Sequence, residues 1–79
     1  MTKYVNLGGS SNVLAYEIGF DYIDVIFGGT NLIYRYSYRS AGMQAVETMK
    51  RLATSGSGLN SYINRYVRKQ YESKMQIKY

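Results

Sequence analysis

The chain has 79 residues and contains no histidine, cysteine or proline, so it can form one small domain and cannot contain Cys/His metal sites, thiol nucleophiles, Ser-His-Asp triads or disulfide bonds. With only five carboxylates left, we expect a protein that is not an enzyme and has no catalytic residues, metal or cofactor. The net charge is +5, and residues 35–79 carry nine Lys or Arg against Glu47 and Glu72, a net charge of +7.

Three segments in the first half alternate between two faces, as β-strands do. They are residues 12–18, 22–27 and 31–38, and short turns containing glycine join them. Such short connections predict an antiparallel meander. Because Asp24 and Arg35 are costly to bury without partners, we expect their faces to point to solvent. The opposite, core-facing residues are then Leu14, Tyr16, Ile18, Ile23, Val25, Phe27, Leu32, Tyr34 and Tyr36.

Two segments in the second half repeat every three to four residues, which predicts helices over residues 41–55 and 59–72. Ser40 is placed to cap the first helix, and Gly56 to end it. The predicted fold is α+β, a three-stranded antiparallel meander with two helices packed on one face. Around a core of residues 10–72, we expect residues 1–9 to form a lead-in and residues 73–79 a tail, either a short edge strand or a mobile arm.

The solvent-facing side of the predicted sheet is more apolar than contact with water requires. Tyr22, Ile26 and Ile33 lie there beside Arg35. A partner protein or a second copy of the chain would cover this face. Scattered surface apolar residues are the simpler alternative. These four residues form the predicted partner interface.

The second predicted helix begins after a Ser/Gly junction and carries cations on its polar side. Backbone N–H groups at a helix start, followed by arginines, can hold a phosphate, although an ordinary helix–helix turn fits the same residues. Aromatic residues beside cations can also stack nucleobases. The predicted phosphate or nucleic-acid site is Ser57, Gly58, Asn60, Arg65, Arg68, Lys69, Tyr38 and Arg39.

The order of these motifs resembles the KTSC domain, a small module named for the C-terminus of some lysyl-tRNA synthetases and also found as a stand-alone bacterial or phage protein. The likeness runs from residue 10 to residue 71. Its matching positions are Ser10-Ser11, then Val25 and Phe27 before Gly28-Gly29, then Tyr34 and Tyr36, and finally Thr54, Gly56, Asn60 and Ile63. Two departures are Gly58, where the family has an aromatic residue, and residues 39–42, which lack the family's Val-Pro. The resemblance implies a fold, and RNA binding is an activity suggested for the family.

We therefore expect a non-catalytic binding module for RNA or another phosphate-bearing ligand, acting through the basic helix face. The alternative is a small protein-binding inhibitor, for example a phage protein that docks on a host or defence complex. Both hypotheses are compatible with a homo-oligomer. No apolar run approaches the ~20 residues of a membrane span, and the N-terminus lacks the apolar segment of a signal peptide. We expect no membrane partner and a cytoplasmic location, in the host cytoplasm if the protein comes from a phage.

Overall fold

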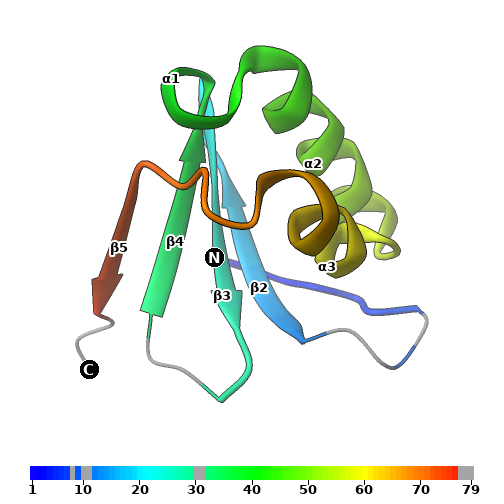
Figure 1. Cartoon of the computed structure of the whole chain (residues 1–79). Coiled ribbons are helices and arrows are strands. Elements are labelled where there is room, and N and C mark those ends of the chain that lie inside the picture. Colours follow the sequence, from blue (N-terminus) through cyan, green and yellow to red (C-terminus); the bar gives the residue numbers. More distant parts are fainter. Residues whose placement is uncertain (8, 10–11, 30–31, 77–79) are drawn as a thin grey trace.

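The computed structural model describes residues 1–7, 9, 12–29 and 32–76 of the chain. It shows one antiparallel sheet in which the strands follow the chain order, with the helices on one face (Figure 1). The strands are β1 (Thr2–Lys3), β2 (Val13–Ile18), β3 (Tyr22–Phe27), β4 (Leu32–Ser37) and β5 (Ser73–Gln76). The α+β class is thereby confirmed. The prediction of a three-stranded sheet is wrong, because the predicted lead-in supplies β1. The tail supplies the edge strand β5, which was one of the two predicted alternatives for it.

Some sequence predictions cannot be compared with the structure. The serine pair Ser10-Ser11, the first residue of the third predicted strand, Asn31, and the end of the tail, residues 77–79, lie outside the described residues. In the described part of the chain, no helix is long and apolar enough to cross a bilayer.

The first predicted helix, over residues 41–55, corresponds to α2 (Met43–Ser55), and a short helix that was not predicted, α1 (Tyr38–Ala41), precedes it. Tyr38, predicted as the end of the third strand, is the first residue of α1. Gly42 separates the two helices because its φ of 93° does not fit a right-handed helix. The prediction that Ser40 caps the first predicted helix is wrong, because Ser40 lies inside α1 and Gly42 is the residue before α2, whereas Ser37 caps α1. The two serines form a capping box, in which each backbone N–H donates to the other's hydroxyl oxygen, at 3.1 and 3.0 Å. Gly56 ends α2 in the left-handed conformation, as predicted.

The second predicted helix is shorter than the sequence indicated and changes type. It begins as α3 (Leu59–Tyr62) and continues as a π-helix, η1 (Ile63–Val67). After Val67 the chain turns, and the Glu72 N–H donates to the Arg35 carbonyl oxygen at 2.6 Å. This bond joins the segment after η1 to β4, so the chain leaves the helical layer before residue 72 and enters β5.

A β-bulge in β2 reverses part of the predicted core face. Val13 pairs with Phe27 while Ala15 pairs with Ile26, so Leu14 is the extra residue. Val13 is consequently buried with Tyr16, whereas Leu14 is 54% exposed. Ile18, at the end of the strand, is also exposed. The assignment of Leu14 and Ile18 to the core is therefore wrong.

Asp24 and Arg35 face away from the helices, but Asp24 is buried rather than solvated. The two residues lie directly opposite each other on β3 and β4. Arg35 Nε donates to Asp24 Oδ1 at 2.8 Å, and Nη2 donates to Oδ2 at 3.0 Å. The Arg35 guanidinium also lies 3.9 Å from the centre of the Tyr22 ring, and Asp24 is only 3% exposed. A bidentate pair compensates for the lost hydration of the carboxylate, so the pair can be buried.

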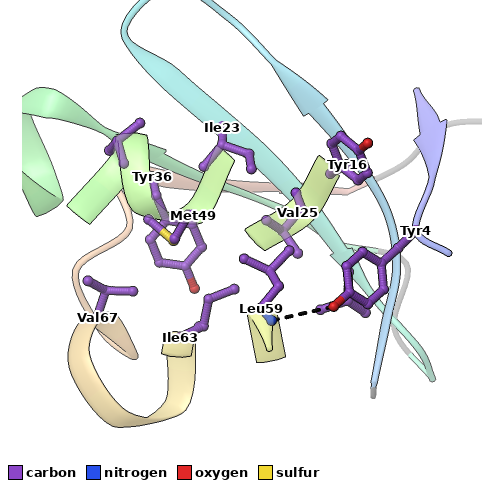
Figure 2. Close-up of a cluster of buried hydrophobic side chains, with 12 residues drawn as sticks. Tyr4, Tyr16, Ile23, Val25, Tyr36, Met49, Leu59, Ile63 and Val67 are labelled. Atoms are coloured by element: carbon purple, nitrogen blue, oxygen red, sulfur yellow. Dashed lines mark hydrogen bonds between the residues drawn. The ribbon is translucent and has the colours of Figure 1, made fainter. Parts of the chain in front are cut away.

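The core lies between the sheet and the helices (Figure 2). Tyr4, from the predicted lead-in, is buried in it, and its hydroxyl accepts a hydrogen bond from the Leu59 N–H at 3.4 Å. The N-terminal residues therefore hold the start of α3. The buried apolar residues are Tyr4, Val13, Tyr16, Ile23, Val25, Tyr36, Val46, Met49, Ala53, Leu59, Ile63 and Val67.

Gly56→Ala should destabilise the protein more than Gly58→Ala. Both glycines have a positive φ, 79° and 87°, so each alanine loses about 1 kcal/mol in backbone conformation. A Cβ at position 56 would also lie 2.9 Å from Val5 Cβ, whereas at position 58 the nearest atom, on Leu52, is 3.6 Å away. Leu7 N–H donates to the Gly56 carbonyl at 2.8 Å and restrains the segment that carries Val5. Urea denaturation compares the two variants, and equal losses of stability would contradict the predicted steric clash.

Asp24→Asn should lower the free energy of unfolding by about 2 kcal/mol. The variant leaves Arg35 opposite a neutral amide and removes a charge-assisted hydrogen bond, an interaction of ~1.5–3 kcal/mol. The lower part of that range applies because the Arg35 side chain is 30% exposed. Glu17→Gln is the matched control, since Glu17 pairs with Asp24 across the strands but is exposed. The control should change stability by less than about 0.5 kcal/mol, and an equal effect of both variants would refute the role of the pair.

Candidate functional site

A pocket of about 410 Å³ opens on the helix side of the sheet. Its sheet wall consists of Phe27 from β3 with Tyr34 and Tyr36 from β4. Side chains from α3, η1 and the segment after η1 form the opposite wall. The volume falls in the ~300–1,000 Å³ range of small-molecule sites.

Four aromatic rings meet edge to face along the pocket. The ring centres of Phe27 and Tyr34 lie 5.4 Å apart, and those of Tyr34 and Tyr71 lie 5.0 Å apart. Tyr71 also contacts Tyr36, with ring centres 6.3 Å apart. The interplanar angles are 81°, 89° and 87°, the T-shaped geometry that aromatic quadrupoles favour. The aromatic wall is therefore held by mutual packing.

Polar side chains of the helical wall recur every four residues. Asn60, Asn64 and Arg68 all line the pocket, with Ile63 beside them. In η1 the hydrogen bonds run from residue i to i+5, so each turn is wider than in an α-helix and residues four apart stay on one side. Asn12, just before β2, adds another amide to the lining. The pocket consequently combines aromatic rings with groups that can both donate and accept hydrogen bonds.

The charged side chains that line the pocket are Arg68 and Lys69, both exposed cations. The ion pairs between described residues join the Met1 amino group to Glu17, Arg35 to Asp24 and Lys50 to Glu47. Within the described part of the chain, no carboxylate neutralises Arg68 or Lys69. The mouth of the pocket is therefore electropositive and favours an anion.

Tyr36 is a buried residue of the sheet wall, and it also lines the pocket. Tyr36 is 1% exposed, and its hydroxyl points toward Ile63 and Val67 of η1 (Figure 2). None of the hydrogen bonds between described residues involves this hydroxyl, and these residues contain no fully buried side-chain polar atom without a partner, so the hydroxyl oxygen itself is not sealed off from the pocket. Burial, with smaller contributions from Tyr34 and Tyr71, raises the pKa of Tyr36 to about 12. The hydroxyl is therefore a neutral donor at physiological pH, placed beside the pocket.

The structure brings together three residues of the predicted phosphate site, Asn60, Arg68 and Lys69. Arg65 is exposed outside the pocket lining, with its guanidinium 5.8 Å from the centre of the Tyr66 ring. Ser57 and Gly58 form the turn before α3 and are also outside the lining. The Leu59 N–H that follows them already bonds to Tyr4, so this helix start offers fewer free donors than the sequence indicated.

Tyr38 and Arg39 lie on α1, apart from the pocket lining. The Tyr38 hydroxyl donates to Glu47 Oε2 at 2.5 Å, and Lys50 Nζ lies 2.7 Å from the same oxygen. These two donors, Lys50 first, lower the pKa of Glu47. Tyr38 is therefore engaged in a local network instead of presenting a free ring. Arg39 is exposed.

The predicted partner interface lies on the face of the sheet that carries no helix (Figure 1). Tyr22, Ile26, Ile33 and Arg35 are each half-buried there. Arg35 is held by Asp24 and stacks on Tyr22. The structure places these residues together, but much of their surface is occupied by one another.

Several pocket residues were not predicted from the sequence as parts of a site. Tyr34 and Tyr36 were assigned to the core only, because period-two alternation cannot distinguish a core residue from the wall of a pocket. Asn64 was assigned to a solvated helix side, although its spacing of four from Asn60 and Arg68 was a usable signal. The unpredicted lining residues are Asn12, Phe27, Tyr34, Tyr36, Ile63, Asn64 and Tyr71.

Comparisons with known proteins found no match: no family model, no curated protein and no solved structure matches the chain. The resemblance to the KTSC domain therefore stays a prediction. Among the described residues, no group of three or more Asp or Glu could hold a metal ion.

Alkaline titration should identify the hydroxyl of Tyr36. Its pKa is about 12 in the folded protein against an ordinary value of 10.0. The unfolded chain therefore loses this proton first, and its contribution to stability is complete below pH 10 and is lost as the pH rises to about 12. Tyr36→Phe should remove this loss. Tyrosinate absorbance of the wild type minus that of the variant should show a midpoint near pH 12, and a midpoint near pH 10 would contradict the burial.

Proposed function

We propose that the protein binds RNA or another phosphate-bearing ligand without catalysing a reaction. The observation that carries this proposal is the pairing of Arg68 and Lys69, free of carboxylate partners among the described residues, with a pocket walled by aromatic rings. Cations that attract phosphates and aromatic planes that accept bases are the two components of single-strand recognition. Of the residues predicted for the phosphate site, the proposal keeps Arg68, Lys69 and Asn60, which line the pocket.

The chemistry of the lining supports binding rather than turnover. Its polar groups are amides, tyrosine hydroxyls and the two cations, and no Asp or Glu lies among the described residues that line it. Amides are poor acids and bases at neutral pH, and the Tyr36 hydroxyl holds its proton to about pH 12. We also propose that the chain is a KTSC-like domain. We further propose that it acts in the cytoplasm, where RNA is accessible.

A protein-binding inhibitor is the second candidate function. The observation that favours it is the helix-free face of the sheet, with Tyr22, Ile26 and Ile33 half-exposed beside the Asp24–Arg35 pair. A partner captured from a lysate after nuclease treatment, and lost on Ile26→Asp but retained when Arg68 is changed, would favour this function. A partner lost on nuclease treatment would favour RNA binding.

Removing both pocket cations should weaken RNA binding and make it less sensitive to salt. Arg68→Gln with Lys69→Gln should raise the Kd for a single-stranded RNA roughly tenfold, a loss of about 1.4 kcal/mol. The slope of log K against log salt should fall by about 1.4, because each lost phosphate contact on a single strand removes ~0.7. Fluorescence anisotropy at several salt concentrations measures both quantities.

The matched control is Arg51→Gln with Lys3→Gln. It removes the same charges from exposed positions on α2 and β1, outside the pocket lining. If net charge alone drives binding, both double variants will lose affinity equally. Salt-independent binding, or no binding to RNA at all, would overturn the proposed function.

A further inference from the structure

We propose that the pocket accepts one nucleotide unit, with the base between the aromatic wall and the amide row and the phosphate at Arg68 and Lys69. This inference rests on the proposed function and specifies what its binding site recognises. The unit can come from single-stranded RNA or from a free mononucleotide, because both present the same chemistry to the pocket.

The shape of the pocket favours a flat aromatic group over an aliphatic one. Phe27, Tyr34 and Tyr71 pack edge to face, with successive ring centres 5.4 and 5.0 Å apart. Aromatic rings in the lining of a pocket can stack with a nucleobase. The volume of about 410 Å³ is in the range that encloses small molecules rather than a folded partner.

The amides supply the hydrogen-bonding groups that a base edge requires. Asn60 and Asn64 each present a donor and an acceptor from the helical wall. On the opposite wall, Tyr36 lines the pocket, and its hydroxyl takes part in no hydrogen bond between the described residues. A base whose edge accepts the Tyr36 hydroxyl proton and also pairs with an amide would bond to both walls.

The cations lie where the phosphate of such a base would leave the pocket. Arg68 follows Asn64 by four residues, so the guanidinium lies about one turn beyond the base-reading amide. Lys69 is its neighbour, and both side chains are exposed. A guanidinium can bind a phosphate through two parallel hydrogen bonds, and the ammonium adds a second charge. Along this wall, the two amides therefore come first and the cation follows. This is the order in which a nucleotide would place its base and then its phosphate.

The two phenylalanines provide a direct reporter with an internal control. Phe27 lines the pocket, whereas Phe20, in the turn between β2 and β3, is 91% exposed. Incorporation of fluorophenylalanine gives two resonances in fluorine NMR, assigned by Phe20→Leu. Adenosine and uridine monophosphates, and a single-stranded RNA of about ten nucleotides, are the probes. Occupancy of the pocket should shift the Phe27 resonance and leave that of Phe20 unchanged.

The affinities of two amide variants complete the test. Asn64→Ala should raise the Kd of the preferred nucleotide and of RNA about tenfold and reduce the preference among bases. Gln70→Ala removes an exposed amide outside the lining and should change neither. Asn64 is exposed on its helix, so the variant is expected to fold.

Each outcome distinguishes this inference from the proposed function. If RNA binds with the expected salt dependence but Phe27 does not shift and Asn64→Ala matches Gln70→Ala, the base pocket is refuted and RNA binding stands. If mononucleotides shift Phe27 and RNA does not, the pocket assignment is supported and RNA is rejected as its ligand. If neither probe binds, both are overturned.

Discussion

The edge-to-face packing of Tyr71 against Tyr34 and Tyr36 is the interaction on which the site depends. It fixes the chain after η1 to the helix side of the sheet, together with the Glu72 N–H bond to the Arg35 carbonyl. Arg68 and Lys69 lie between this attachment and the buried Val67. Their backbone is therefore held at both ends, while their side chains remain exposed. The same rings that stabilise the fold thus place the cations at the pocket.

When helices cover only one face of a small sheet, the side chains on the other face have no second layer to pack against. The Asp24–Arg35 pair, covered by the Tyr22 ring, occupies the centre of that open face. This arrangement lets β3 and β4 carry charged residues opposite each other, where unpaired charges would destabilise the sheet. The charged residues of β3 and β4 therefore stay off the helix side, where the side chains form the core and line the pocket.

Periodicity predicted the parts of the fold in which local pattern and tertiary packing agree. It located β3, most of β4 and the end of α2 at Gly56, because these elements keep their period throughout. It failed at Leu14, where one extra residue in the bulge reverses the alternation without changing composition. It also failed for Thr2–Lys3, since a strand of two residues has no period and forms only because β2 pairs with it.

The candidate site was harder to predict because its walls consist of core residues. Tyr36 is needed to fill the interior, yet its hydroxyl lies beside the pocket, so an assignment to core or surface describes only part of the residue. Walls that are already packed lose little conformational freedom when a ligand binds, whereas Arg68 and Lys69 must be ordered from exposed states. Selectivity should therefore reside in the rigid amide and aromatic walls. The salt-dependent part of the affinity should reside in the two cations, whose positions the sequence predicted by charge alone.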